Sequence, residues 1–194
     1  MRFKLILAGL LILTAMPVVA QVVPQATDSS SPLYAGIGYS RFSPDWGPGR
    51  TLDGLDAYVG IMFPHRFHIP NGFGIEAEGR DMFFNPSTNV PNYIKSEASL
   101  GGGLIYKYQH WQKFRPYGKF FYEAGRIDYP YYSLPDAYAY STLTVMGGGL
   151  EYKVKTHYWI RADYSYERWP NLFKLGKDLN PVGVTVGMTY NFMR

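Results

Sequence analysis

Hydrophobic and polar residues alternate with a period of two along most of the chain. From Leu33 onward, aromatic and β-branched side chains recur at every second position, and clusters of Pro, Gly, Asn and Asp divide the sequence into segments. A period of two is typical of β-strands that have one apolar face and one polar face. The eight predicted strands cover residues 33–42, 55–63, 73–83, 95–108, 116–127, 140–154, 157–169 and 182–192.

The last predicted strand shows the two faces most clearly. Val184, Val186 and Met188 share one face, and small or polar residues such as Thr185 and Thr189 alternate with them. The apolar face of such a strand points into the core of a soluble sandwich, or outward to lipid in a membrane barrel. The alternation predicts an all-β fold and leaves these two architectures open.

The N-terminal segment has the organisation of a secretory signal peptide. Arg2 and Lys4 precede an uncharged run over residues 5–15, and small side chains suit cleavage before Gln21. The apolar run is too short to cross a bilayer as a helix. We therefore expect three parts: a signal peptide at residues 1–20, a polar periplasmic lead-in at residues 21–32, and one barrel domain at residues 33–194.

Charged residues in the predicted strands fall mainly on the face opposite the apolar one. This set comprises Glu76, Glu78, Arg80, Glu97, Lys107, Lys119, Glu123, Glu151, Lys153, Arg161, Asp163 and Glu167. A soluble sandwich would expose this face to water, whereas a membrane barrel would enclose it. Together with the signal peptide and the aromatic strand ends, the set favours an antiparallel up-and-down transmembrane β-barrel of about eight strands.

The interior of an eight-stranded barrel is just wide enough for side chains to fill. We therefore predict that central charges form a paired network that fills the lumen, namely Glu78, Lys119, Glu123, Arg161 and Asp163. Glu123 and Glu78 are the predicted partners of Arg161. The alternative is a narrow gated channel, in which an exchange of ion-pair partners opens an ion path.

The connections and an internal repeat predict how the barrel is oriented. Connections after odd-numbered strands are longer than most of those after even-numbered strands, so we expect the former outside the cell and both termini in the periplasm. The sequence GGGLIYK at residues 101–107 returns as GGGLEYK at residues 147–153. Its Leu and Tyr are expected to face lipid, and its Lys to point inward at the rim. Its glycines suit tight curvature or leave room for long inward side chains.

The chain resembles the small eight-stranded outer-membrane barrel proteins of the OmpA/OmpX type, a group that is also described as porin-family or opacity-type. The resemblance rests on the signal peptide, the eight alternating segments and the closing sequence VTVGMTYNF at residues 184–192. It implies secretion to the periplasm, insertion into outer-membrane lipid, and recognition of the C-terminal strand by the barrel assembly machinery. Family members usually end on the aromatic residue, whereas Met193 and Arg194 follow Phe192 here. The resemblance implies the fold and leaves the task open.

Candidate chemistry outside the lumen is sparse. The four histidines, His65, His68, His110 and His157, fall in or beside the predicted periplasmic turns, where a metal site is the alternative to solvated turn residues. They lack the local His-x-Ser spacing of outer-membrane lipid A deacylases and leave no His for an omptin-type rim protease. We predict no enzymatic activity, metal or cofactor, with a lipid-modifying enzyme as an alternative.

The overall charge argues against a nucleic-acid partner. Removal of Arg2 and Lys4 lowers the formal net charge from +4 to +2, and the remaining bases form no stripe. The chain has no cysteine, so it cannot form a disulfide or a thiolate metal site.

Aromatic residues near the predicted external loops suggest a contact surface. They are Trp46, Tyr129, Tyr131, Tyr132, Tyr138 and Trp169. Tyrosine-rich surfaces suit adhesion or ligand contact because they supply rigid amphipathic area, whereas an aromatic girdle at the lipid interface has the same composition. We therefore expect a structural, adhesive or ligand-contacting role for the external loops.

Overall fold

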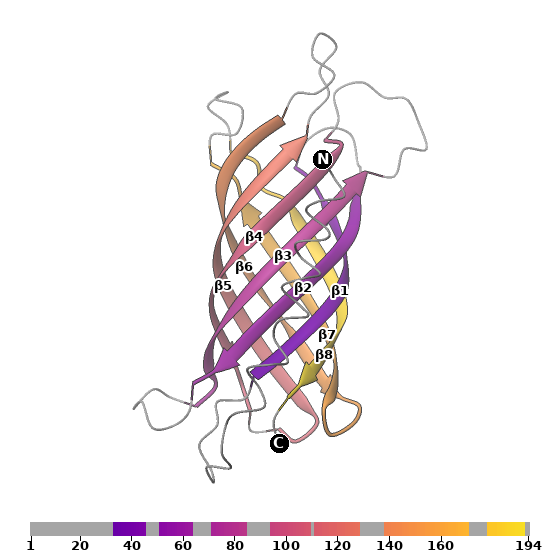
Figure 1. Cartoon of the computed structure of the whole chain (residues 1–194), viewed down its shortest axis with the longest axis vertical. Coiled ribbons are helices and arrows are strands. Elements are labelled where there is room, and N and C mark those ends of the chain that lie inside the picture. The colour runs from indigo at the N-terminus through magenta and orange to yellow at the C-terminus, as the bar shows by residue number, and fades with distance from the viewer. Residues whose placement is uncertain are drawn as a thin grey trace, which may run out of the picture. The chain divides into compact units, whose positions relative to one another are not determined.

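Eight antiparallel strands close into one barrel in the computed structural model, which describes residues 33–45, 51–63, 71–84, 94–109, 111–128, 138–170 and 178–192 (Figure 1). The strands are β1 (Leu33–Ser43), β2 (Leu52–Met62), β3 (Phe73–Phe84), β4 (Ser96–Lys107), β5 (Phe114–Asp128), β6 (Tyr138–Lys153), β7 (Tyr158–Arg168) and β8 (Val182–Asn191). Each strand pairs with its neighbours in sequence, and β8 closes the barrel against β1. All eight predicted strands are confirmed, with ends that shift by at most three residues.

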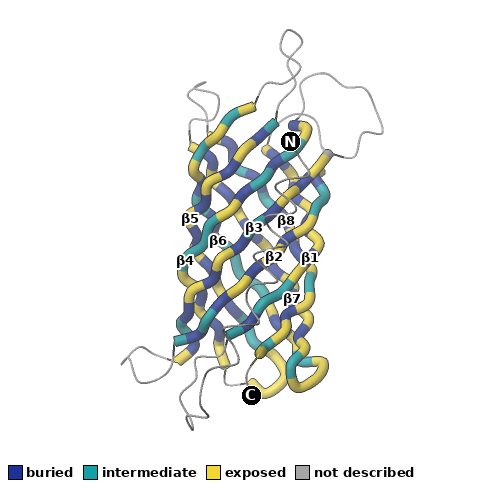
Figure 2. Tube along the Cα trace, viewed as in Figure 1, coloured by how far each residue is buried: buried dark blue, intermediate teal, exposed yellow. Residues whose placement is uncertain are grey.

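The alternation in the sequence becomes an inside and an outside. Buried and exposed residues alternate along each strand (Figure 2). Large apolar residues such as Ile37 and Leu55 lie outward and are 70% and 71% exposed, whereas charged residues such as Glu76 and Arg161 are buried inside. A soluble sandwich buries its apolar faces, so this arrangement excludes the sandwich and confirms the barrel. No helix in the described part of the chain is long and apolar enough to cross a membrane.

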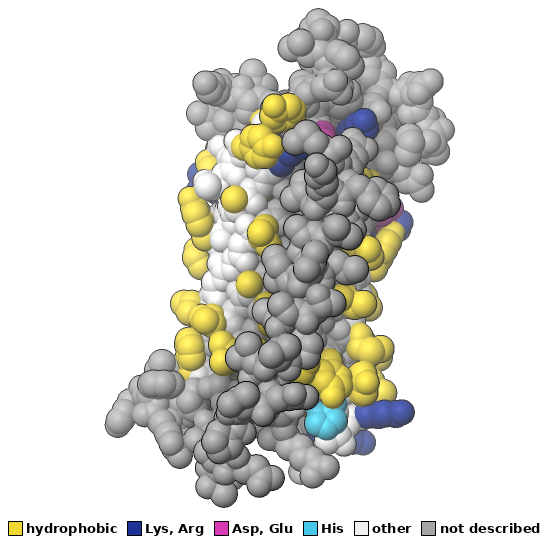
Figure 3. Space-filling view, in the orientation of Figure 1, with side chains coloured by type: hydrophobic (Ala, Val, Ile, Leu, Met, Phe, Trp, Pro, Cys, Tyr) yellow, Lys and Arg dark blue, Asp and Glu magenta, His cyan; other side chains and the backbone are white. Residues whose placement is uncertain are grey.

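The two ends of the barrel differ. We call the end at which β1 begins and β8 ends the turn end, and the end at which odd-numbered strands finish the loop end; the turn end is at the bottom of Figure 1. Exposed aromatic residues surround the turn end: Tyr106, Tyr108, Trp111, Phe114, Tyr152, Tyr158, Tyr190 and Phe192. Hydrophobic side chains continue along the wall to the loop end, with Lys and Arg side chains near both ends (Figure 3).

The repeated sequence places equivalent residues on equivalent faces. Leu104 and Tyr106 of the first copy lie outward, as the pattern predicts. Lys107, the last residue of the first copy, is buried, and its Nζ donates to Glu151 of the second copy at 2.6 Å. Position 105 holds Ile in the first copy where the second has Glu151, so this difference between the copies supplies the partner of Lys107.

Glycines on the inner face make room for aromatic side chains. A Cβ at Gly60 would collide with the ring of Tyr34, and one at Gly125 would collide with the indole of Trp169. Both aromatic residues are almost fully buried. Large aromatic side chains on the inner face therefore pack against glycines, which have no side chain. This arrangement fills a narrow bore without widening the barrel.

Candidate functional site: the interior of the barrel

The interior holds an unusual number of ionisable side chains. Among the described residues, eight carboxyl groups and four basic groups are buried. The acids are Asp56, Glu76, Glu78, Glu97, Glu123, Glu151, Asp163 and Glu167, and the bases are Arg80, Lys107, Lys119 and Arg161. Buried charges are tolerated only when partners and hydrogen bonds compensate for lost hydration, so the pairing decides what this interior does.

Arg161 is the centre of the pairing near the turn end. Its two terminal nitrogens donate to the two carboxylate oxygens of Glu76, each at 2.8 Å. Its Nε donates to the hydroxyl of Tyr117 at 2.7 Å and lies 3.3 Å from Asp163. The hydroxyl of Tyr34 also donates to the carboxylate of Glu76, at 2.7 Å. A bidentate guanidinium–carboxylate pair is among the strongest polar contacts a protein forms, and this one is enclosed by aromatic rings.

The contacts continue from Arg161 toward the loop end. Asp163 lies 3.4 Å from Nζ of Lys119, which donates to Glu78 at 2.7 Å. Glu78 in turn pairs with Arg80, which also pairs with Glu167. The pairing thus alternates between β3 and β7 on facing walls, with Lys119 of β5 as a bridge. One continuous network extends along the bore.

The predicted network is present in part. Arg161, Asp163, Lys119 and Glu78 are joined by direct contacts, but the predicted partners of Arg161 are wrong. Glu76 is its partner instead. Glu76 and Arg161 are each the fourth residue of strands that run in the same direction, whereas Glu78 is the sixth. The predicted strand at residues 157–169 makes Arg161 the fifth residue, so the observed strand ends are needed to match the two positions.

Glu123 lies outside the ion-paired network. Neither of its carboxylate oxygens has a hydrogen-bond partner within the described residues, and the same holds for Glu97. Both side chains are about 99% buried. The four buried basic groups cannot neutralise the eight buried carboxyl groups. The excess carboxyl groups lie in the half of the bore nearer the loop end, around Arg80. The alternation of inward and outward positions along the strand correctly places Glu123 in the interior. It does not show which inward side chains contact one another.

Apolar clusters close the bore on both sides of the network. Toward the loop end the cluster comprises Phe42, Leu52, Met82, Ile94, Phe121, Ile127, Leu143, Val145, Trp169 and Leu179. Toward the turn end it comprises Tyr34, Tyr58, Met62, Ile105 and Tyr117. Apolar constrictions close a pore by dewetting it, and here buried apolar side chains flank the charged network on both sides. The described interior is therefore a packed core.

The predicted aromatic contact residues divide into three groups. Tyr138 is exposed at the loop end, where its ring lies 4.9 Å from the guanidinium of Arg126. Trp169 is a correction, because it is fully buried in the loop-end cluster and its Nε1 donates to Glu167 at 2.9 Å. A tryptophan with a buried carboxylate within reach is stabilised inside rather than on a surface. The remaining four residues, Trp46, Tyr129, Tyr131 and Tyr132, lie outside the described residues.

Of the four histidines, only His157 is among the described residues. It precedes β7, its ring stacks on Tyr190, and its Nδ1 lies 2.8 Å from the carbonyl oxygen of Asn191. His65, His68 and His110 lie outside the described residues. The described residues contain no group of three His, Cys, Asp or Glu side chains placed to hold a metal ion.

Residues 7–192 match the family described as outer membrane protein beta-barrel domain. The match covers nearly the whole chain. The chain belongs to this family. The outward apolar wall of the barrel therefore faces lipid, and the protein is located in the bacterial outer membrane. No curated protein sequence matches the chain.

Solved structures with the same architecture are distant in sequence. Ail, the attachment invasion locus protein of Yersinia pestis, has a TM-score of 0.59 and 15% identity over 84% of this chain and 99% of its own. Neisserial surface protein A has a TM-score of 0.59 and 14% identity over 85% and 99%. OprG from Pseudomonas aeruginosa has a TM-score of 0.52 and 13% identity over 86% and 98%. At these sequence identities, the comparison shows a shared fold.

Proposed function

We propose that this outer-membrane barrel is a closed scaffold that presents its loop-end connections to ligands or surfaces outside the cell. The observation that carries the proposal is the filled bore. An ion-paired network lies between two apolar clusters, so the interior serves stability rather than transport. In a scaffold with a packed core, the variable connections are where specific contacts are made.

The orientation and the loop sequences support this proposal. The two longest connections, residues 85–95 and 169–181, follow odd-numbered strands, and the two shortest, residues 108–113 and 154–157, follow even-numbered strands, although residues 63–72 after β2 outnumber residues 44–51 and 129–137. Long connections are typical of the external side of outer-membrane barrels. The connection between β5 and β6 contains Tyr129, Tyr131 and Tyr132, residues of the type that provides adhesive area at low entropic cost. Ail of Yersinia pestis is named for attachment and has been solved with the heparin analogue sucrose octasulfate, at a TM-score of 0.55 and 16% identity. External contact is thus a task that this architecture supports.

An adhesion assay tests the proposal. Cells that display the full-length protein should bind to surfaces coated with a sulfated glycan. Replacement of residues 129–137 by a Gly-Ser linker of equal length should reduce binding at least about tenfold, a loss of 1.4 kcal/mol. A matched Gly-Ser replacement of the β6–β7 turn at residues 154–157 is the control, because this turn lies at the opposite end of the barrel. Unchanged binding after the first replacement, or no binding to the glycan surface, would contradict a contact role for these loops.

The alternatives predict different results with the purified protein. A narrow gated channel predicts conductance, which the sealed bore opposes. A lipid-modifying enzyme predicts turnover of outer-membrane lipid, and we propose that the protein is not an enzyme because the only described histidine, His157, contacts a backbone carbonyl and Tyr190. Incubation of the reconstituted protein with radiolabelled lipid A, followed by chromatography, should show no product.

We further propose that residues 1–20 direct export and that the C-terminal strand is read by the barrel assembly machinery. The mature protein should begin at Gln21, which N-terminal sequencing of outer-membrane material checks. Phe192, which is half exposed beyond the end of β8, should be the aromatic signal. Phe192→Ala should slow assembly and leave unfolded chain in the periplasm, whereas Phe192→Tyr should assemble normally.

A further inference from the structure

Positive charge collects at the turn end of the barrel. Residues 108–116 and 152–158, which include the β4–β5 and β6–β7 turns, contain four Lys or Arg residues and no Asp or Glu, namely Lys113, Arg115, Lys153 and Lys155. None of the four forms an ion pair within the part of the chain that the structure describes. Figure 3 shows Lys and Arg side chains at this end. The turn end is therefore a basic face without a described counter-charge.

Two of these bases share one aromatic ring at the turn-end opening of the bore. The guanidinium of Arg115 lies 3.9 Å from the centre of the Trp159 ring, and Nζ of Lys153 lies 5.8 Å from it. Both bases continue the inward rows of β5 and β6, two residues from the buried Tyr117 and Glu151. Trp159 is 2% exposed, whereas both bases are half-buried and reach water. We call this opening, where Arg115, Lys153 and Trp159 lie, the mouth. Its indole holds two cations in place on the inner wall.

The carboxylate next to these bases already has a partner. Glu151 lies opposite Arg115 in the register of β5 and β6, but it accepts from Nζ of Lys107 at 2.6 Å. Lys113 and Lys153 lie opposite each other as well, because the backbone nitrogen of Lys153 donates to the carbonyl oxygen of Lys113 at 2.9 Å. Like charges on directly opposite residues repel one another. A bound anion would remove this repulsion.

An unpartnered amide donor lies on the strand at the other side of Trp159. Asn191 of β8 is two residues beyond the buried Thr189, which lies opposite Trp159. Nδ2 of Asn191 is buried and has no hydrogen-bond partner within the described residues. A buried donor without an acceptor costs free energy, so its presence needs an explanation. Arg115, Lys153 and Asn191 together bring three donor groups to one mouth, and a ligand with a negative charge and acceptor oxygens would satisfy all three.

The position of the mouth restricts the class of anion. The turn-end apolar cluster, which includes Tyr34 and Tyr58, closes the bore beyond the mouth. The barrel wall separates the mouth from the surrounding lipid, so a headgroup held in the bilayer does not reach the donors. A carboxylate at the end of a flexible side chain does reach them, and its two oxygens match the fork of a guanidinium. Lys113 and Lys155 are exposed on the turns beside the mouth, which favours a chain that carries several carboxylates.

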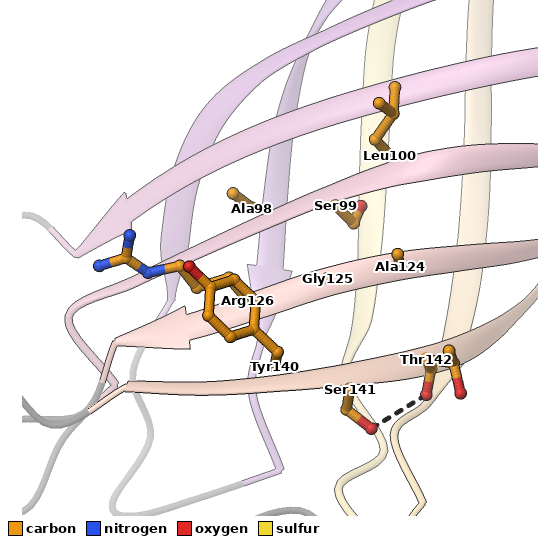
Figure 4. Close-up of a pocket in the computed structure, with 9 residues that line it drawn as sticks. All are labelled: Ala98, Ser99, Leu100, Ala124, Gly125, Arg126, Tyr140, Ser141 and Thr142. Carbon is orange, nitrogen blue, oxygen red and sulfur yellow. Dashed lines mark hydrogen bonds between the residues drawn. The ribbon is translucent and has the colours of Figure 1, made fainter. Parts of the chain in front are cut away.

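The arginines of the loop end are arranged differently. Three outward arginines there each pair with an aspartate, namely Arg41 with Asp53, Arg126 with Asp128 and Arg168 with Asp178. Figure 4 shows Arg126 beside Tyr140 on the outer wall, and the guanidinium lies 6.0 Å from that ring. The charges of these loop-end arginines are balanced within the protein, so they provide matched controls for the unpaired bases of the mouth.

We propose that the mouth binds an acidic peptide. One carboxylate of the peptide contacts Arg115, Lys153 and the amide of Asn191, and neighbouring carboxylates contact Lys113 and Lys155. The proposal concerns the end of the barrel opposite the external loops and shares only the orientation of the barrel with the proposed function. In that orientation the mouth opens to the periplasm, so the partner is a periplasmic chain rich in carboxylates.

Fluorescence anisotropy of the purified protein in non-ionic detergent tests the proposal with a labelled hexaglutamate peptide. The peptide should bind saturably to the wild type. Arg115→Gln, Lys153→Gln and Asn191→Asp should each raise its Kd at least about tenfold, whereas Arg115→Lys, which keeps the charge, should raise it less than about threefold. Arg41→Gln, which removes the same charge at the loop end, should bind within about twofold of the wild type. A hexaglutamine peptide should not bind.

Competition distinguishes the acidic peptide from other anions. Neither millimolar inorganic phosphate nor a short-chain phosphatidylglycerol should displace the labelled peptide. Displacement by either one, equal weakening by Arg115→Gln and Arg41→Gln, or the absence of saturable binding would overturn the proposal. Migration of the unheated protein as a folded species on a gel shows for each variant that a loss of binding does not reflect a loss of the barrel.

The orientation is tested separately, because the binding assay does not depend on it. The chain has no cysteine, so Lys155→Cys introduces a single thiol at the β6–β7 turn. A membrane-impermeant maleimide should label this thiol only after the outer membrane is permeabilised. Labelling in intact cells would overturn the orientation that the proposed function also uses, whereas a failure of peptide binding would overturn the site in the mouth alone.

Discussion

Arg161 of β7 and Glu76 of β3 meet across the bore, with both terminal nitrogens of Arg161 within 2.8 Å of the carboxylate oxygens of Glu76. The guanidinium also lies 4.1 Å from the ring of Tyr58 and 4.5 Å from that of Tyr117. Glu76, Tyr58 and Tyr117 are all buried, as is Asp163, so a charge that loses its partner here is held away from bulk water. The pair ties together two walls that are not neighbours in the barrel.

Arg161→Ala should therefore destabilise the barrel by about 3–5 kcal/mol, because it leaves the carboxylate of Glu76 buried without its partner. Glu76→Gln should also be costly, and the double variant should recover part of the summed loss. Reversible urea unfolding in lipid vesicles measures the four free energies of the cycle. A coupling energy of about 1–3 kcal/mol is expected between these two residues.

A second cycle with Glu123→Gln is the matched control for that measurement. Glu123 is equally buried but forms no ion pair with Arg161 in the described interior. The effects of Arg161→Ala and Glu123→Gln should add within about 0.5 kcal/mol. Stronger coupling of Arg161 to Glu123 than to Glu76 would mean that the pairing is different from the one in the structure.

Glu123→Gln alone should leave stability unchanged or raise it by about 1 kcal/mol. Its carboxylate is buried without a hydrogen-bond partner in the described residues, so neutralising it removes a desolvation cost and preserves its shape. The comparison is Glu76→Gln, where the same chemical change breaks a bidentate pair. The urea midpoints of the two variants should move apart. Equal losses would show that Glu123 has a partner as strong as that of Glu76.

Val186→Arg should cost about 2–4 kcal/mol, because Val186 lies on the lipid-facing wall in the middle of β8. The same change at Val182, the first residue of β8 at the loop end, should cost about 1 kcal/mol or less, because a cation there reaches the interface. Unfolding free energies in vesicles compare the two variants. Similar costs at both positions would place Val186 away from the centre of the membrane.

The sequence predicts the wall of this barrel better than its interior. A period of two determines which residues face inward, so the eight strands and the inward position of Arg161 and Glu123 follow from parity. Which inward side chains contact one another depends on the stagger of non-neighbouring strands. The alternation of residues along each strand gives no information about that stagger. For this reason the sequence places Glu76 on the inner face but does not identify it as the partner of Arg161.

The buried position of Trp169 is a second point at which the prediction from sequence is wrong. Its position at the end of β7 is the same for an indole on an external loop and for one that turns back into the bore. Two features select the inner position, namely Glu167, which accepts from its Nε1, and Gly125, whose missing Cβ leaves room for the ring. Glu167 lies two residues before Trp169, so the alternation of residues already puts both side chains on the inner face, whereas Gly125 lies on β5 and only the folded register brings it to the ring.

Single-channel recording in planar bilayers tests most directly whether the bore is closed. The wild-type barrel should show no steady conductance, because the loop-end cluster around Trp169 and the paired charges below it fill the interior. Trp169→Ala combined with Arg161→Ala should produce frequent openings, since it removes the largest side chain of the seal and the centre of the network. Steady conductance of the wild-type protein, unchanged in the double variant, would contradict the packed interior on which this account rests.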